Sequence, residues 1–204
     1  ALFHPLLFPS YGTLLILAAN PDLFGAFGEK IHIVWLIIVF VLTFLFPVIW
    51  LLMMKKLEMI SSLYLETASE RIIPFVAVAT FYLWTAWMFK PNVNMKIPTN
   101  IFVFYMMLGS CLAIFSSFFI NIFSKISLHA LGTGNLIGLM LIVIRQSPYD
   151  LRWAVPACIL LAGLVGTARL FLKAHNTNQI FAGYFVGFTA QFLAFSIAPF
   201  IFSH

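Results

Sequence analysis

The sequence predicts an all-α fold, a polytopic transmembrane helix bundle, and two observations carry that prediction. Of the 204 residues, 63% are hydrophobic and 8% are charged, whereas soluble domains carry about 25% charged residues. Apolar runs of about 20 residues, the length of a membrane-spanning helix, recur along the whole chain. We therefore expect residues 1–204 to form a single integral membrane domain whose core lies between the helices.

Six core spans are predicted from apolar runs that end at polar or proline-containing segments. They cover residues 31–54, 72–89, 101–123, 128–144, 153–170 and 179–202. The first span contains Pro47, which predicts a kink because proline cannot continue the helical hydrogen-bond ladder. An apolar segment over 1–19, broken at its start by Pro5 and Pro9, precedes these spans and either crosses the membrane or enters it and returns.

The order of the spans predicts which polar segments share a membrane face. Since each pair of spans returns the chain to the face it left, one face receives residues 55–71, 125–129 and 169–178. The opposite face receives residues 20–31, 90–100 and 145–152. In the segment 55–71, the mixture of charged and apolar residues is typical of an amphipathic segment along the membrane surface.

Small residues predict where the helices pack most closely, because lipid provides no hydrophobic drive for helix association. Glycines recur in the last three spans, which we expect to form the packed centre; they are Gly132, Gly134, Gly138, Gly163, Gly166, Gly183 and Gly187. Cys111 and Cys158 lie inside apolar runs and are predicted to be small buried side chains rather than disulfide partners or metal ligands.

Two polar islands between apolar runs carry the candidate chemistry. One contains Arg169 and His175, and the other contains Lys125 and His129. Such residues are functional candidates because the bilayer penalises a charge that has neither a partner nor a task. Arg71, from the third polar segment on this face, adds a further cation. A cluster of cations and imidazoles is the kind of site that binds a phosphate group.

Two predicted helix starts make this face more attractive to an anion. Ser127 is placed to cap the following span, which puts His129 in its first turn. Asn176 or Asn178 would cap the last span in the same way, with Gln179 in its first turn. The amide dipoles at both starts favour negative charge.

These residues resemble the type 2 phosphatidic acid phosphatases, membrane lipid phosphatases related to the vanadium haloperoxidases. The family motif Ser-Arg-x5-His-x3-Asp is matched by Ala168-Arg169-x5-His175-x3-Gln179. Of the motif Pro-Ser-Gly-His, the stretch Ile126-Ser127-Leu128-His129 keeps the Ser and the His. The order of spans around the two motifs is also similar, so the resemblance covers the C-terminal half, and the chain looks most like divergent bacterial members of the superfamily.

The sequence departs from the family pattern at two motifs. Gln179 replaces the closing aspartate, so it can accept a hydrogen bond from an imidazole but supplies no charge. In the family motif Lys-x6-Arg-Pro, Tyr64 stands in the place of the lysine, and Arg71 is followed by Pro74 rather than by an adjacent proline. Lys125 could supply the missing cation.

The resemblance implies a metal-independent lipid phosphatase without a cofactor, acting on a phosphomonoester or diphosphate of a lipid. His175, oriented by Gln179, would attack phosphorus and form a phosphohistidine, and His129 would protonate the leaving alcohol and then activate water. The phosphate would be bound by Arg169, Lys125, Arg71 and Ser127.

Two other interpretations stay open. The chain could be a degenerate, non-catalytic membrane subunit that keeps the phosphatase fold, which Gln179 and Tyr64 favour. His129 and His175 could also ligate a haem. The expected partners are a lipid phosphate and membrane lipids, and no nucleic acid, because the net charge of +5 is spread without a basic run. The identity of the lipid and the oligomeric state are left open.

The distribution of Lys and Arg predicts the orientation in the membrane. The site face carries Lys55, Lys56, Arg71, Lys125, Arg169 and Lys173, and the other face carries Lys30, Lys90, Lys96, Arg145 and Arg152. When the three candidate site cations are set aside, the second face is the more basic one. By the positive-inside rule, the site lies on the extracytoplasmic side of a bacterial inner membrane.

Overall fold

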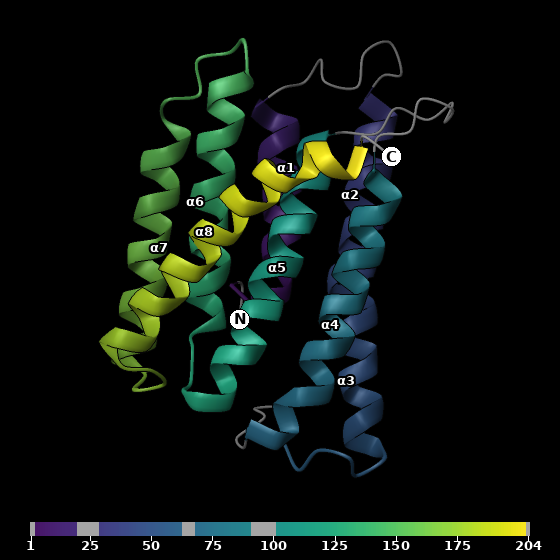
Figure 1. The fold of residues 1–204 in the computed structure, drawn as a ribbon, viewed down its shortest axis with the longest axis vertical. Coiled ribbons are helices and arrows are strands. Elements are labelled where there is room, and N and C mark those ends of the chain that lie inside the picture. Colours follow the sequence, from purple (N-terminus) through teal and green to yellow (C-terminus); the bar gives the residue numbers. More distant parts are fainter. Residues whose placement is uncertain (1–2, 20–28, 63–67, 91–100, 203–204) are drawn as a thin grey trace.

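The computed structural model describes residues 3–19, 29–62, 68–90 and 101–202, with the backbone alone at 29, 30, 68, 69, 201 and 202. Every regular element in these ranges is helical, which confirms the all-α prediction (Figure 1). In chain order they are η1 (Pro5–Leu7), α1 (Phe8–Ala19), α2 (Glu29–Phe40), the π-helix η3 (Val41–Leu45), α3 (Phe46–Lys56), α4 (Ala68–Phe89), α5 (Ile101–Phe123), α6 (Leu128–Gln146), α7 (Ala154–Phe171) and α8 (Thr177–Phe202).

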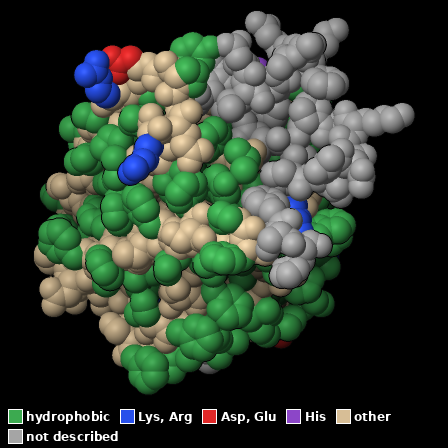
Figure 2. Space-filling model, turned by 45° about the horizontal axis from the view of Figure 1, so that its top comes forward, with side chains coloured by type: hydrophobic (Ala, Val, Ile, Leu, Met, Phe, Trp, Pro, Cys, Tyr) green, Lys and Arg blue, Asp and Glu red, His purple; other side chains and the backbone are tan. Residues whose placement is uncertain are grey.

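Six helices in the described part of the chain are long and apolar enough to cross a membrane, so the chain is an integral membrane protein. They are Ile31–Lys56, Glu70–Phe89, Ile101–Phe123, Leu128–Gln146, Ala154–Phe171 and Thr177–Phe200. All six predicted spans are therefore confirmed. In the view of Figure 2, hydrophobic side chains cover much of the described surface, and only a few Lys and Arg side chains are visible.

Within the described residues, the proline-broken N-terminal segment consists of η1 followed by α1, which runs in one direction and does not return (Figure 1). His4 caps the short 3-10 helix η1, in which Pro5 stands at the start, where its missing N–H costs no helical hydrogen bond. Helix α1 then runs to the end of the molecule at which α2 begins (Figure 1). It is shorter than the six spans and lies against α2, α5 and α6.

Pro47 changes the helix geometry of the first span one turn before it. A proline ring clashes with the carbonyl group four residues earlier, here that of Thr43. The wider turn of η3 lies at this place, and π-helical turns are a common way to accommodate such a clash. The buried Thr43 hydroxyl donates to the Val39 carbonyl at 2.8 Å. The predicted kink site is thus a local π-helix.

The predicted amphipathic segment 55–71 is described only in part, and its described residues include the end of α3 and the start of α4. Helix α3 ends at Lys56, and Glu58 takes a left-handed conformation with φ of 57°. The Met59 N–H then bonds back to the Met54 carbonyl at 3.0 Å, which closes the helix. Residues 57–62 form no helix, because this closure turns the chain away from the α3 axis. Residues 63–67, including Tyr64, lie outside the described residues.

The most buried spans are α5 and α6, and α8 packs against both, so the packed centre is not the last three spans. Helix α5 is 72% buried over its apolar window, whereas α7 is only 28% buried and lies at the outside of the bundle (Figure 1). Of the two glycines in α7, Gly166 packs against the Tyr184 side chain of α8, whereas Gly163 has no heavy atom within 4 Å of a Cβ placed there, so glycine content overstated the packing of α7. Helix α5 offers a single glycine, Gly109, and it lies directly under the Gln191 side chain of α8.

Buried amide and hydroxyl groups join the three central helices. Gln191 Nε2 donates to the Tyr105 carbonyl at 3.0 Å, and the Ser110 hydroxyl donates to Asn135 Oδ1 at 3.3 Å. Asn135 Nδ2 also reaches the Gly187 carbonyl at 3.5 Å. Such bonds hold membrane helices together at about 0.6 to 2 kcal/mol each. Both cysteines are free and buried, as predicted.

We expect Gly187→Ala to destabilise the protein and Gly163→Ala not to. A Cβ at Gly187 would collide with the Leu131 carbonyl of α6, which can move only if α6 and α8 separate. Overpacking of this kind costs about 1–3 kcal/mol. An alanine at Gly163 meets open space and gains about 1 kcal/mol of helix propensity. Thermal unfolding in one detergent should give a lower Tm for Gly187→Ala only; equal shifts would contradict this interface.

Candidate functional site

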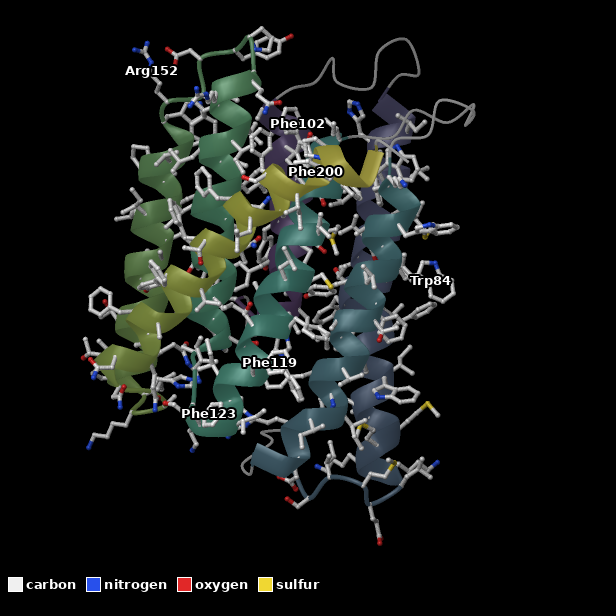
Figure 3. All side chains as sticks on the ribbon, in the orientation of Figure 1. Trp84, Phe102, Phe119, Phe123, Arg152 and Phe200 are labelled. Carbon is white, nitrogen blue, oxygen red and sulfur yellow. The ribbon has the colours of Figure 1, made fainter. Side chains whose placement is uncertain are left out.

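The polar segments predicted to share a face lie at one end of the bundle. Helix α3 ends there, α4 begins there, and the α5–α6 and α7–α8 connections lie there too (Figure 1). Nitrogen-bearing side chains gather at this end near Phe123, the last residue of α5 (Figure 3). Arg152 marks the opposite end, where it pairs with Asp150 at 2.7 Å. We call the end with Phe123 the site end.

The end of α7 turns the chain sharply into the site. Lys173 takes a left-handed conformation with φ of 51°. Its N–H bonds to the Leu170 carbonyl at 2.9 Å, and the Ala174 N–H bonds to the Arg169 carbonyl at 3.1 Å. This pair of bonds is a Schellman motif with lysine at the usual glycine position. It keeps Arg169 in the last turn of α7 and places His175 directly before α8.

A reciprocal cap begins α8. The Gln179 N–H donates to Asn176 Oδ1 at 2.9 Å, and the Asn176 N–H donates back to Gln179 Oε1 at 3.4 Å. This is a capping box, with Asn176 as the cap. Of the two predicted capping residues, the structure therefore selects Asn176. Gln179 thus has a structural task that fixes its side chain.

The same Gln179 oxygen holds His175. His175 Nδ1 lies 2.9 Å from Gln179 Oε1. Because the Asn176 N–H can only donate, the atom that it meets is the amide oxygen and not the nitrogen. That oxygen can only accept, so Nδ1 of His175 carries the hydrogen in this contact. The lone pair of a neutral His175 is then on Nε2, which leaves this atom free to act as a nucleophile.

Burial lowers the pKa of His175 below its ordinary value. Its hydrogen bond with Gln179 acts in the opposite direction, and the positive charges of Arg169, Lys125 and Arg71 lower the pKa further. Since the ordinary histidine pKa is about 6.5, His175 is mainly neutral at pH 7. These electrostatic effects also show that cations from three separate segments lie near His175.

Helices α6 and α8 are tied together at their starts. The Ser127 hydroxyl accepts from the Ala130 N–H at 3.4 Å, which confirms the predicted cap. The Ser127 N–H donates to the Gln179 carbonyl at 3.2 Å. The Ser127 side chain is fully buried, so the cap accounts for its presence. Its contact with a phosphate stays a prediction.

The three cations differ in how they are held. Arg71 donates to Asn121 Oδ1 of α5 at 2.7 Å, which draws the start of α4 to the site. Lys125 is exposed. The Nε of Arg169 is buried and has no acceptor within the described residues. Buried donors are nearly always hydrogen-bonded, so a buried Arg169 Nε without an acceptor favours a ligand with oxygen acceptors at this place.

His129 lies in the first turn of α6, as predicted, and is half-buried. Three groups act on it electrostatically, namely Arg169, His175 and His4. The first two connect it to the α7–α8 turn. The third, His4, comes from the N-terminal segment, and sequence reasoning did not identify it. Asn121, the partner of Arg71, was also missed.

The structure therefore brings the predicted residues Arg71, Lys125, Ser127, His129, Arg169, His175 and Gln179 to one end of the bundle. A neutral imidazole with a free Nε2 thus lies beside the start of α8, where three cations act on it electrostatically. This arrangement can bind an oxyanion and attack it. Among the described residues, no group of three or more His, Cys, Asp or Glu is placed to hold a metal ion.

No family model, curated protein or solved structure matches the chain.

Proposed function

We propose that the protein is a membrane-embedded lipid phosphate phosphatase, a divergent bacterial member of the type 2 phosphatidic acid phosphatase superfamily. The observation that carries the proposal is the fixed tautomer of His175. Gln179 Oε1 accepts the hydrogen bond from Nδ1, and three cations act electrostatically on this imidazole. The matched motifs around Arg169 and Ser127 give the same assignment from the sequence.

In the first step, His175 Nε2 attacks phosphorus and the bond to the leaving oxygen breaks. His129 gives a proton to that oxygen, so a neutral alcohol departs and a phosphohistidine remains. The positive charge on the phosphorylated imidazole is not neutralised by Gln179, which has no charge. The Gln179 oxygen still accepts a hydrogen bond from Nδ1 of His175 in both steps, because the capping box holds the Gln179 side chain in place.

In the second step, His129 takes a proton from water, and the hydroxide formed attacks phosphorus. The nitrogen–phosphorus bond breaks, inorganic phosphate leaves, and both histidines return to their first state. Arg169, Lys125 and Arg71 stabilise the negative charge that the phosphoryl oxygens carry in both steps. Fixed charges in a site of low dielectric stabilise such a transition state without reorganisation.

Phosphate release from a panel of lipid phosphates tests the proposal. We expect the purified protein to release phosphate at an unchanged rate in EDTA, because Arg169, Lys125 and Arg71 meet the phosphate charge. Vanadate should inhibit, since it resembles the pentacoordinate transition state. Loss of activity on chelation that a divalent ion restores would reject this mechanism. Phosphate binding without release would favour the non-catalytic subunit, which Gln179 also fits.

We also propose that the site end is extracytoplasmic in a bacterial inner membrane, from the charge distribution of the loops. Single cysteines test this, because both native cysteines are buried. A membrane-impermeant maleimide added to intact cells should label Ser124→Cys at the site end. It should not label Tyr149→Cys, at the other end, until the cells are opened. Both positions are exposed. The reverse labelling pattern would place the site in the cytoplasm.

A further inference from the structure

Helix α1 packs in parallel against the face of α6 that carries His129. The Phe8 ring fills the space next to Gly132, and Gly12 lies against Leu136, one turn further along α6. Both helices begin on the side of the site end and run the same way (Figure 1). One turn back from Phe8 is His4, and one turn back from Gly132 is His129. The register of the two helices therefore places His4 next to His129.

The surroundings of His4 agree with this register. Helix η1, which follows His4 directly, contacts α6 and the π-helix η3. The His4 ring meets the Phe44 ring of η3 edge to face, with centroids 6.0 Å apart. His4 also acts electrostatically on His129. His4 is thus held between an aromatic ring and the candidate acid of the site.

A hydrogen bond fixes which nitrogen of His4 can donate. Nδ1 of His4 accepts from the Leu6 N–H at 3.3 Å. Because an N–H can only donate, Nδ1 is the unprotonated nitrogen, and neutral His4 carries its hydrogen on Nε2. Burial lowers the pKa of His4, so the neutral form predominates at pH 7. In the described part of the chain, Nε2 has no acceptor.

The order of the groups indicates which part of a substrate His4 faces. His175, Arg169 and His4 all act electrostatically on His129. Arg169, Lys125 and Arg71, which act on His175, exert no such effect on His4. In an in-line displacement, the leaving oxygen departs on the side of phosphorus away from the nucleophile. With His175 as nucleophile and His129 as acid, the leaving group extends past His129 towards His4.

We propose that His4 is a third histidine of the site, which contacts the leaving group and donates its Nε2 hydrogen to a neutral oxygen there. This inference rests on the proposed phosphatase function. A neutral oxygen, as in the ester and hydroxyl groups of a glycerol moiety, suits His4 because neutral His4 donates from Nε2 and Arg169, Lys125 and Arg71 exert no electrostatic effect on it. His4 would then favour leaving groups that carry such an oxygen over plain alkyl groups.

Two short-chain substrates test this contact by turnover. Dihexanoyl phosphatidate has ester oxygens next to the leaving oxygen, and octyl phosphate has none. His4→Asn keeps an acceptor for the Leu6 N–H, since asparagine caps well, but it cannot reach as far. We expect it to lower kcat/KM for dihexanoyl phosphatidate about two- to ten-fold, the range of one neutral hydrogen bond, and to leave octyl phosphate unchanged. An equal loss with both substrates, or no loss, would overturn the contact.

Imidazole NMR of the unmodified protein, labelled with ¹⁵N-histidine, separates this inference from the proposed function. We expect dihexanoyl phosphatidate, observed before it is consumed, to shift the signals of His175, His129 and His4. Octyl phosphate should shift those of His175 and His129 alone. Shifts that never include His4 would reject its role and leave the phosphate site intact. No histidine shift with either ligand would reject both proposals.

Discussion

His175→Ala is expected to reduce hydrolysis of a lipid phosphate to the background rate. The substitution removes the imidazole whose Nδ1 is held by Gln179 and whose Nε2 is left free to attack. Loss of the nucleophile in enzymes that form a covalent intermediate costs about 10³-fold or more. Arg169 and Lys125 remain, so phosphate affinity should persist. Phosphate release and inorganic phosphate binding, measured on the same preparation, check the two parts.

His32→Ala is the matched control, because it removes a histidine of α2 near the opposite end of the bundle (Figure 1). Its turnover should equal that of the unmodified protein. Full activity in His175→Ala would end the phosphatase assignment at this site and leave the structural subunit as the better interpretation.

The pH dependence should report the same imidazole. His175 must be neutral to attack, and its lowered pKa means that activity falls on the acid side only below about pH 6.5. Gln179→Glu keeps the length of the side chain and an oxygen for both hydrogen bonds, but adds a negative charge. The charge favours protonated His175, so the acid limb of the rate profile should move to higher pH. An unmoved limb would show that another group controls it.

The spans could be predicted from the sequence because hydrophobic length is a local property. Every predicted span was confirmed, whereas the identity of the packed centre was not predictable from glycines alone. Gly163 and Gly187 look alike in the sequence, yet one faces open space and the other meets the Leu131 carbonyl. Burial of α5 depends instead on contacts such as that between Gln191 and Tyr105, which join residues far apart in the chain.

The site was predictable where it depends on motif spacing and on the order of the spans. Arg169 and His175 flank one turn, and the even number of spans between the turns brings Lys125 to the same end. His4 and Asn121 follow no motif, and their positions depend on the register of α1 on α6 and of α4 on α5. The register between two packed helices depends on how their side chains interlock. The hydrophobic pattern of a single sequence therefore does not predict it.

His129→Ala should slow turnover severely while still allowing the first half of the reaction with a suitable substrate. His129 gives the proton that the leaving oxygen needs, and such acid catalysis contributes about 10²- to 10⁴-fold. A p-nitrophenyl phosphate ester needs little protonation, because its leaving group is already a weak base. It should therefore phosphorylate His175 even in the variant. The water that follows has lost its base, so the phosphoenzyme should accumulate.

The accumulated species can be identified by its chemistry. A phosphohistidine is labile in acid and stable in alkali, whereas a phosphoserine or phosphothreonine shows the opposite behaviour in alkali. Radiolabelled substrate should thus leave an acid-labile label on His129→Ala, and no label on the double variant with His175→Ala. Because Arg169 and Gln179 are intact in both proteins, the difference isolates Nε2 of His175 as the acceptor. A label that survives in the double variant would place the covalent step on another residue and reject the roles of both histidines.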